Sequence, residues 1–429
     1  MTDGLEPSRY YRLPWSLTDN IISWLEPTTK CNLRCEGCYR KDTASHKSLE
    51  EVRRDLDVFR RLRKSDCISI AGGEPLLHPE IVEIVSMVRE MGWKPIVNSN
   101  GVALDEKLLR ELKRAGVYGF TFHIDTSQKR PHVKATTEEG LNEVRLKYAR
   151  MLADAGGIAC SFNATVTEKT LPEVPAMVRW AGRHADIVHT MVFILFRSPV
   201  LAGSYAFFAD GRQVTFDDTY KDTKWGGSDK LHSPDVVRAV READPLYEPA
   251  AFLNGTANPG SFKWLMANRI VQKGDTVGYV SPRFMEIVQT YNHLKHGTYL
   301  SYAKPGLCRR GKSVSFVTGL LDRTMRRIFG RLLRRMLANP ANIFRPAHIQ
   351  TMMIIQPVNI ESDGRQDMCD ACPDVTVHDG KLVWSCRLEE LNEFGSMVSA
   401  VPLERMEISS GKESSSDEVP EAAGPLIPS

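Results

Sequence analysis

Strand-like and helix-like segments alternate between residues 20 and 196, and this alternation limits the fold more than any other feature of the chain. Predicted strands cover residues 20–25, 67–71, 95–98, 118–125, 158–166 and 187–195. Predicted helices lie between them, and Ser48 with Glu51 forms a capping box at the first. Repeated strand–helix units favour parallel strands. The sequence therefore predicts an α/β fold, a partial (βα)6 barrel with its functional residues at the C-terminal ends of the strands.

Three cysteines, Cys31, Cys35 and Cys38, follow the first predicted strand within eight residues. Thiolates at such close spacing hold a soft metal or an iron-sulfur centre. Three ligands leave a fourth position open, which suits a bound substrate or cofactor better than a structural metal. On spacing alone, half of a zinc site with a fourth ligand such as His46 is the alternative.

Polar or small residues also follow the next predicted strands. Residues 72–75 read Gly-Gly-Glu-Pro after the second strand, and Asn98 and Asn100 end the third. In the fourth strand, His123 and Asp125 share one face because side chains alternate between the two faces of a sheet. These residues should therefore meet the cysteine loop at one edge of the sheet.

The cysteine loop, with aromatic Tyr39 after its last cysteine, and the Gly-Gly-Glu-Pro turn together resemble the radical S-adenosylmethionine (SAM) superfamily over residues 18–197. The resemblance implies that Cys31, Cys35 and Cys38 hold three irons of a [4Fe-4S] cluster, while SAM chelates the fourth iron. An electron donor such as flavodoxin or ferredoxin would reduce the cluster. Cleavage of SAM would then give a 5'-deoxyadenosyl radical that abstracts hydrogen from the substrate.

The same resemblance implies roles for individual residues. Gly72 and Gly73 would let the backbone approach SAM closely, because glycine has no side chain. Glu74 would bind the methionine ammonium group, and Tyr39 would lie near the adenine. The other candidates for cofactor contacts are Pro75, Asn98, Asn100, Asp125, Ser161 and Asn163.

Two residues are candidates for catalysis. His123 is either a contact of SAM or substrate, or a polar residue of the barrel wall. Arg130 lies in the loop after the fourth strand, where it either holds an anionic group of the substrate or is a solvated charge.

A second set of cysteines, Cys308, Cys369, Cys372 and Cys386, lies in the C-terminal half. Four thiolates are enough for a second [4Fe-4S] cluster, and structural zinc is the alternative. The set resembles a reduced form of the SPASM or twitch extensions that follow many radical SAM barrels. The remaining cysteines, Cys67 and Cys160, fall within predicted strands and should be small buried hydrophobes.

The region after the barrel has a less regular pattern. Residues 198–304 predict an irregular segment that covers the substrate, with helices at 234–242 and 282–296. Residues 321–337 predict a helix with an apolar stripe and six arginines. Such a helix either lies on an anionic membrane surface or packs its stripe in the core with solvated arginines.

Composition excludes several classes of protein. The 429 residues carry a net charge of +3, which does not favour nucleic acid as a partner. No apolar run is long enough to cross a bilayer, and the N-terminus lacks a secretion signal. We therefore expect a cytoplasmic protein, held at the inner membrane face if the arginine-rich helix binds lipid.

The predicted organisation has five parts. They are an N-terminal extension (1–17), the radical SAM barrel (18–197), the covering region (198–304), an auxiliary-cluster region (305–402) and a disordered tail (403–429).

The substrate is predicted from weaker features. The basic helix, and a loose similarity of residues 123–131 and 369–390 to membrane-lipid-modifying members related to tetraether lipid synthases, favour a lipid or another long-chain substrate. A maturase of ribosomal peptides is the alternative enzyme, although few residues precede the barrel to bind a leader peptide. A non-catalytic, metal-stabilised binding protein is the alternative from another class.

Overall fold

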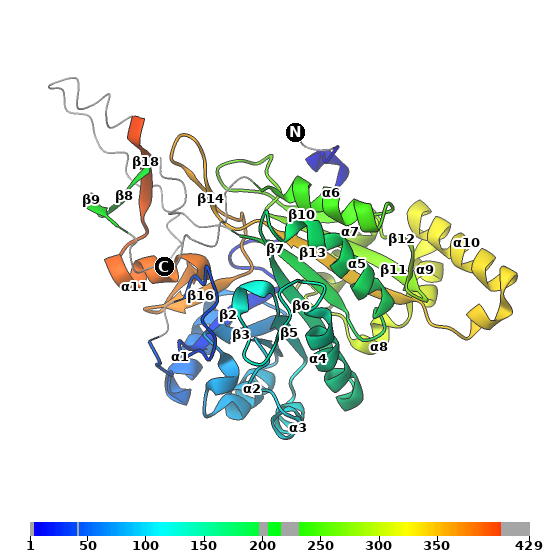
Figure 1. The fold of residues 1–429 in the computed structure, drawn as a ribbon, viewed down its shortest axis with the longest axis horizontal. Coiled ribbons are helices and arrows are strands. Elements are labelled where there is room, and N and C mark those ends of the chain that lie inside the picture. The colour runs from blue at the N-terminus through cyan, green and yellow to red at the C-terminus, as the bar shows by residue number, and fades with distance from the viewer. Residues whose placement is uncertain (1–3, 41–42, 197–204, 216–230, 405–429) are drawn as a thin grey trace.

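The computed structural model describes residues 4–40, 43–196, 205–215 and 231–404, and a central sheet of eleven strands organises them (Figure 1). The strands of this sheet are β1 (Tyr11–Arg12), β2 (Ile22–Thr28), β3 (Cys67–Gly72), β4 (Lys94–Ser99), β5 (Gly119–His123), β6 (Ala159–Val166), β7 (Thr190–Leu195), β10 (Ala251–Leu253), β11 (Trp264–Gln272), β12 (Asp275–Tyr279) and β13 (His348–Ile355). Their order is β1-β10-β11-β13-β7-β6-β5-β4-β3-β2, with β12 paired to β11.

Strands β2 to β7 are the six predicted strands, and each pairs in parallel with the next. The helices between them are α1 (Leu49–Leu62), α2 (Ile81–Glu90), α3 (Glu106–Ala115), α4 (Asn142–Ala155) and α5 (Val174–Arg183). Ser48 and Glu51 form the predicted capping box. The Phe122 ring stacks on Tyr148 of α4 at 4.8 Å between centroids, so the phenylalanines of β5 face the helices. The predicted central parallel sheet is therefore confirmed.

The sheet continues beyond β7, which the sequence did not predict. Strand β13 pairs in parallel with β7, and β11 pairs antiparallel with β13. Within residues 198–304, helices α6 (Ser233–Ala243) and α7 (Pro282–His296) match the two predicted helices. The prediction that this region is otherwise irregular is wrong for its described part, because β10, β11 and β12 belong to the central sheet. Buried residues on both faces of β11 leave no alternating pattern, and its partner β13 lies far along the chain.

Chain connectivity forces this sheet to curl. Strands β1 and β2 form its opposite edges, although they are neighbours in sequence. Ten flat strands at a spacing of about 4.8 Å would separate those edges by about 43 Å. The chain from Arg12 to Ile22 can extend only about 35 Å. The sheet therefore bends until its two edges approach each other, which leaves a seam between them.

The loop at residues 369–373 fills this seam. On the β1 side, Arg12 forms an ion pair with Asp370 at 2.6 Å. On the β2 side, Asn20 donates to the Ala371 carbonyl at 3.0 Å, and Arg63 donates to the Cys372 carbonyl at 2.9 Å. This loop therefore links the two edges of the sheet without forming a strand.

The hairpin β16 (Val375–His378) and β17 (Lys381–Trp384) continues from this loop and packs beside β2 and α1. It leads into α11 (Leu388–Phe394). A separate three-stranded sheet, β18-β8-β9, combines β8 (Tyr205–Ala209) and β9 (Arg212–Val214) with β18 (Ser399–Pro402). The short hairpin β14 (Asn359–Ile360) and β15 (Gln366–Asp367) completes this part of the molecule.

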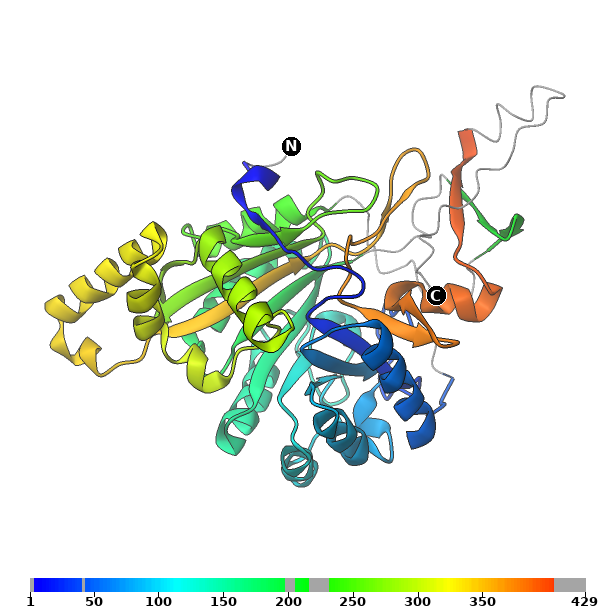
Figure 2. The ribbon, with the colours of Figure 1, turned by 180° about the vertical axis from the view of Figure 1, so that it is seen from behind.

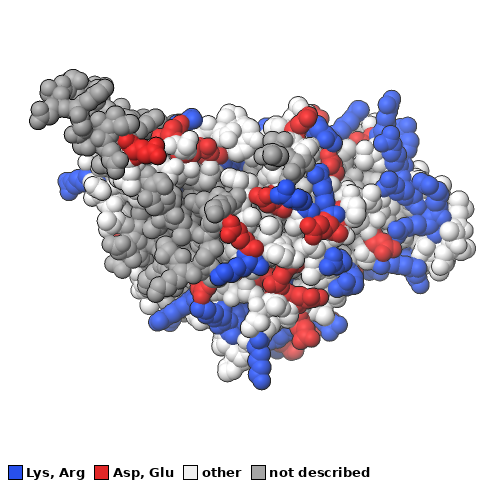
Figure 3. Space-filling model, turned by 45° about the horizontal axis from the view of Figure 1, so that its top comes forward, with Lys and Arg blue, Asp and Glu red and all other residues white. Residues whose placement is uncertain are grey.

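At the other end of the molecule lie α8 (Pro305–Cys308), α9 (Gly311–Gly319), α10 (Arg323–Ala338) and the 3-10 helix η7 (Pro340–Ile343). Of these, α9 and α10 project from the sheet in both ribbon views (Figures 1 and 2), whereas α8 contacts β13. Lysine and arginine gather over this end in the space-filling view (Figure 3).

One hydrophobic core contains residues from the predicted extension, barrel, covering region and auxiliary region. None of the described helices combines the length and the apolar character needed to cross a membrane. The predicted disordered tail lies outside the described residues apart from residues 403 and 404.

Candidate cofactor site

The cysteine loop lies over the C-terminal ends of β4 and β5, as predicted. The Glu36 amide donates to the Ser127 carbonyl just after β5 at 3.0 Å. After β4, Asn100 donates to the Asn32 side chain at 2.7 Å, and its Nδ2 lies 4.0 Å from Cys31 Sγ. Asn100, predicted to contact the cofactor, therefore holds the loop in place.

The three thiols lie close enough to affect one another electrostatically. Burial raises the pKa of Cys35, and the neighbouring Cys38, Asp125 and Cys31 add to this effect. Burial likewise raises the pKa of Cys31. Thiolate ligation must therefore displace protons, as metal binding to cysteine generally does. In the described part of the chain, no group of three or more Cys, His, Asp or Glu side chains converges on a single metal ion. An iron-sulfur cluster is wider than one ion, so its ligands lie farther apart.

Gly72 and Gly73 do allow a close approach, but to the base of the cysteine loop. A Cβ on Gly72, whose φ is +101°, would lie 2.4 Å from the Thr28 carbonyl oxygen. A Cβ on Gly73 would lie 2.4 Å from the Lys30 carbonyl oxygen. The Glu74 amide donates to that same Lys30 carbonyl at 2.8 Å. The two glycines therefore let the end of β3 hold the base of the loop.

The Glu74 side chain is fully buried, and its contact with the methionine ammonium group stays a prediction. Its carboxylate accepts hydrogen bonds from Ser99 Oγ and the Asn100 amide, both at 2.7 Å, and from the Leu76 amide at 3.0 Å. Burial raises its pKa to about 7 in spite of these donors. Glu74 therefore joins the ends of β3 and β4 from within the protein. The neighbouring Pro75 is buried at the start of a 3-10 turn.

A row of polar side chains crosses the face of the sheet opposite α4 and α5. Asn98, Thr121 and Ser161 are register neighbours on β4, β5 and β6, and Asn163 lies two residues beyond Ser161. Asn98 Nδ2, Ser161 Oγ and Asn163 Oδ1 are buried and have no hydrogen-bond partner among the described residues. An unpartnered buried polar group costs about 1–3 kcal/mol. Three such atoms on one face fit a polar ligand, and all three belong to residues predicted to contact SAM.

The row continues into the strands that the sequence did not predict. Thr190 on β7, Thr351 on β13 and Asn268 on β11 follow Ser161 in register. Asn268 Oδ1 is also buried without a partner among the described residues. Sequence reasoning missed Asn268 because its strand was not recognised. The signal was the polar pair Asn268 and Arg269 inside the otherwise apolar segment 264–271.

His123 and Asp125 form the predicted pair on one face of the sheet. His123 Nε2 lies 2.7 Å from Asp125 Oδ2 and 3.0 Å from Thr165 Oγ1. Burial opposes the charged imidazole, but the Asp125 carboxylate outweighs it and raises the pKa of His123. For Asp125, burial is opposed by His123, Ser127 and Thr165, which hold the pKa of that carboxyl well below its usual range. Asp125 therefore orients His123 and stays ionised.

Arg130 is 7% exposed, so it is not a solvated loop charge. Its guanidinium donates to Gln128 at 2.8 Å and to the Asn100 carbonyl at 2.7 Å. Burial lowers its pKa, while Tyr148, Cys35 and Glu74 oppose that shift. Its hydrogen bonds join the loop after β5 to the end of β4, and its positive charge lies close enough to Cys35 to favour the thiolate.

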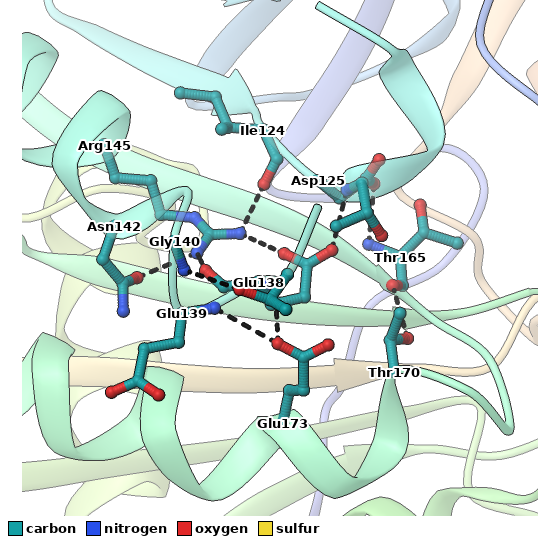
Figure 4. A network of polar contacts seen from close by, with 12 residues as sticks. Ile124, Asp125, Glu138, Glu139, Gly140, Asn142, Arg145, Thr165, Thr170 and Glu173 are labelled. Atoms are coloured by element: carbon teal, nitrogen blue, oxygen red, sulfur yellow. Dashed lines mark hydrogen bonds and ion pairs between the residues drawn. The ribbon is translucent and has the colours of Figure 1, made fainter. Parts of the chain in front are cut away.

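A buried ion pair supports the end of β5 from below (Figure 4). Arg145 and Glu138 pair with both side chains fully buried, and Arg145 also donates to the Ile124 carbonyl at 2.6 Å. Glu138 in turn accepts from the Thr126 amide at 2.7 Å. Hydrogen bonds thus hold the backbone of Ile124 and Thr126, the two neighbours of Asp125, in place. The sequence signal for this ion pair was Arg145 on the apolar face of its helix.

The C-terminal cysteines do not all come together. Cys372 and Cys369 share a hydrogen bond, and this bond together with Lys263 lowers the pKa of Cys369. Burial and the nearby Cys369 raise the pKa of Cys386 to about 12. These three thiols form one group at the C-terminal end of β13, where Gln356 lies 4.0 Å from Cys369.

Cys308 is wrong as the fourth ligand of this group. It ends α8, and the neighbouring Gly311 amide donates to the Ala347 carbonyl just before β13 at 2.8 Å. Strand β13 runs for eight residues between that point and the other three cysteines. At about 3.3 Å per residue it separates them by about 26 Å.

Tyr39 and Arg40 connect the two cysteine regions. The Arg40 guanidinium lies 5.0 Å from the centroid of the 36% exposed Tyr39 ring. Arg40 pairs with Glu26 on β2 and lies 3.4 Å from Glu389 on α11. The end of the first cysteine loop is therefore anchored to the helix that follows Cys386.

Residues 25–181, which include the cysteine loop, the glycine turn and the His123–Asp125 pair, match the model of the Radical SAM superfamily. This segment is a radical SAM domain. The chain is similar to 7,8-dihydro-6-hydroxymethylpterin dimethyltransferase of Methanocaldococcus jannaschii, with 26% identity covering 40% of this chain and 36% of that protein. It is also similar to AdoMet-dependent heme synthase of Methanosarcina barkeri, with 26% identity covering 41% of this chain and 50% of that protein.

Among solved structures, SuiB of Streptococcus suis bound to its precursor peptide SuiA matches 43% of this chain and 41% of its own, with 16% identity and a TM-score of 0.34. The chain spans half or less of the length of these relatives. The similarity to these relatives therefore covers part of the molecule rather than the whole of it.

Proposed function

We propose that this chain is a radical SAM enzyme that abstracts hydrogen from a substrate with a long apolar part. The observation that carries the proposal is the placement of Cys31, Cys35 and Cys38 on the glycine end of β3, beside a sheet face with unpartnered polar atoms. In this proposal the three thiolates hold a [4Fe-4S] cluster. With SAM and an external electron donor, such a cluster would supply the radical chemistry that abstracts hydrogen from the substrate.

The side chains of the radical SAM domain would bind, orient and shield. Asn98, Ser161 and Asn163 would bind the polar groups of SAM with the atoms that have no protein partner. Arg130 would stabilise the negative charge of the Cys35 thiolate, next to which it is buried. Asp125 would favour the protonated form of His123 and hold its ring in place.

The apolar part of the substrate is inferred from the next row on the same face. In register with His123 and Asn163 lie Val192, Met353 and Met266 on β7, β13 and β11. The row is thus polar over the predicted SAM contacts on β5 and β6 and apolar over β7 and the added strands β13 and β11. Such an arrangement suits a long-chain molecule, including the lipid predicted from the sequence.

Anaerobic reconstitution tests the cofactor assignment. We expect reductive cleavage of SAM to 5'-deoxyadenosine, which Cys35→Ala abolishes. Cys160→Ala should retain cleavage, because Cys160 is buried in β6 away from the loop. Zinc in place of iron, or no cleavage under strong reduction, would overturn the proposal.

The iron content tests the second cysteine group. About eight irons per chain would mean that Cys369, Cys372 and Cys386 hold a second cluster, and about four that they do not. We propose the second cluster with these three thiolates. Its loss in Cys372→Ala should leave the first four irons in place.

The substrate class is tested in cells. Extracts of cells with and without the gene should differ in lipids or other long-chain compounds. A difference confined to peptides would contradict the long-chain proposal and support a peptide maturase.

A further inference from the structure

Residues 305–347, the basic hairpin, contain α8, α9, α10 and η7. Helices α9 and α10 project from the sheet (Figures 1 and 2). The segment has ten lysines and arginines and one acid, Asp322. Asp322 is 5% exposed and accepts hydrogen bonds from Ser281 Oγ and the Met325 amide. The surface of the basic hairpin therefore carries positive charge without a neighbouring negative charge of its own.

Part of this charge is used by the fold. Arg326 donates to the Gly319 carbonyl at 2.9 Å and Arg331 to the Val277 carbonyl at 2.9 Å. Lys312 donates to the Asn342 carbonyl at 2.7 Å. Six exposed arginines form neither an ion pair nor a side-chain hydrogen bond with any described residue. They are Arg309, Arg310, Arg323, Arg327, Arg334 and Arg345.

Exposed apolar side chains gather on the same segment. Nine of the fifteen large hydrophobic residues exposed in the described part of the chain belong to it. They are Leu307, Phe316, Val317, Leu320, Leu321, Leu333, Leu337, Ile343 and Phe344. Exposed fractions reach 70% for Leu320 and 88% for Phe344. Such a concentration on a monomer marks a surface that contacts an apolar phase or a partner.

The exposed apolar side chains are different from those that α10 packs into the core. Helix α10 buries Met325, Ile328 and Leu332, and Ile328 lies against Gly278 of β12. Packing of an apolar stripe in the core, one of the two predicted alternatives for this helix, therefore accounts for only one set of its apolar residues. The exposed apolar residues are additional to it.

A pocket of about 410 Å³ joins the two kinds of side chain. Arg309, Arg310 and Arg345 line it together with Ile343 and Phe344. Guanidinium groups bind phosphate oxygens in pairs of hydrogen bonds. A pocket with guanidinium groups and an apolar wall suits a phosphate that carries an acyl chain.

We propose that the basic hairpin docks on an anionic phospholipid bilayer. The exposed apolar side chains enter the interface, the six exposed arginines contact lipid phosphates, and the Arg309–Arg310–Arg345 pocket holds one headgroup phosphate. Charge complementarity selects this occupant, since an amphipathic surface rich in arginine is attracted to anionic lipid.

Docking would leave the cofactor site accessible. The basic hairpin joins the sheet at the start of β13, where Arg310 bridges to Ala347. The cysteine loop lies at the opposite ends of the parallel strands. The hairpin therefore acts as an anchor, and this inference does not depend on the proposed chemistry.

Vesicle flotation with the full-length, reconstituted protein tests the anchor. We expect binding to vesicles of phosphatidylcholine with phosphatidylglycerol, and at least tenfold weaker binding to phosphatidylcholine alone. Salt should weaken it by screening exposed charges. Arg309→Gln/Arg345→Gln should weaken binding about tenfold and reduce the salt dependence. Leu320→Ser/Phe344→Ser should weaken binding about tenfold and keep the salt dependence.

Matched controls replace similar residues elsewhere. Arg61→Gln on α1 and Leu294→Ser on α7, where Leu294 is 81% exposed, should bind as the unchanged protein does. Equal binding to neutral vesicles, or arginine variants that bind normally, would overturn the proposal. Binding of inorganic phosphate without vesicle binding would assign the pocket to free phosphate and also overturn it.

A second copy of the chain is the other partner that could bind to the exposed apolar surface. Self-association that Leu320→Ser/Phe344→Ser abolishes, with no vesicle binding, would overturn lipid docking. Formation of 5'-deoxyadenosine, measured in the same preparations without lipid, reports on the cofactor site independently. Failure of one proposal is thus distinguishable from failure of the other.

Discussion

Glu74 places a titrating carboxyl inside the protein, next to the backbone that holds the cysteine loop. Burial raises its pKa to about 7, against 4.5 for a free glutamate side chain. A group whose pKa rises on folding binds its proton more tightly in the folded state. Its contribution to stability is therefore complete below about pH 4.5 and is lost as the pH rises to about 7.

Glu74→Gln should remove this dependence. The variant loses the acceptor for the Asn100 amide, so we expect it to be less stable than the unchanged protein at pH 5. The difference should shrink by up to about 3 kcal/mol between pH 5 and pH 8, at about 1.4 kcal/mol per pKa unit. Urea denaturation of the metal-free protein at several pH values measures it. Glu106→Gln, whose side chain is 81% exposed, should run parallel to the unchanged protein. A parallel profile for Glu74→Gln would contradict the prediction.

The sequence predicted which residues belong to the site where they are part of a motif. It predicted their roles less well where packing against neighbours determines those roles. The sequence identified Glu74, Asn100 and Arg130 as site residues, and all three lie at the ends of β3, β4 and β5. Their contacts could not be predicted, because they depend on which neighbour each side chain meets. Arg130 was expected in solvent or on substrate, and its burial against the Asn100 carbonyl excludes the solvated alternative.

Among the elements, the turn after β3 should be the most sensitive to added bulk. Gly72 and Gly92 share a left-handed backbone, with φ of +101° and +96°. A Cβ on Gly92 meets nothing within 4 Å, whereas one on Gly72 lies 2.4 Å from the Thr28 carbonyl oxygen. The two positions therefore separate backbone strain from displacement of the cysteine loop.

Gly92→Ala should cost about 1–2 kcal/mol of unfolding free energy from strain alone and keep SAM cleavage. Gly72→Ala should cost at least about 2 kcal/mol more and lose most cleavage, because the base of the cysteine loop must move. Thermal unfolding and the 5'-deoxyadenosine assay measure the two effects. Equal losses of stability and activity in both variants would refute the role assigned to the turn.

The six strands β2 to β7 were predictable because each is a local pattern followed by its own helix. Strands β11 and β13 were not, because each is recognised only by its pairing with the other across about eighty residues. The position of Cys308 illustrates the same difficulty. The spacing of Cys308 and Cys369 in the sequence does not indicate that strand β13 lies between the two cysteines and keeps them apart.

At the scale of the whole molecule, Arg40 couples the two cysteine regions. Its side chain is 4% exposed and joins Glu26 on β2 to Glu389 on α11. Removing one partner from a buried ion pair leaves charges without compensation and costs about 3–5 kcal/mol. Arg40→Gln should therefore loosen both regions rather than one.

Hydrogen exchange measures this coupling. In Arg40→Gln we expect faster exchange in residues 31–40 and also in 385–394. Arg9→Gln, which breaks an exposed pair with Glu248, should change neither segment, because such pairs contribute about 0–1 kcal/mol. Faster exchange confined to residues 31–40 would show that the two regions are independent.

The seam between β1 and β2 has a consequence for how the protein is made. Asn20 meets Ala371, its partner across the seam, 351 positions later in the chain. A ribosome that adds about 5–20 residues per second needs roughly 20 to 70 seconds to cover that distance. During this interval β2 is an unpaired edge of the kind that associates with other chains. Biosynthesis of this protein therefore includes a period of exposure that ends only when the 369–373 loop emerges.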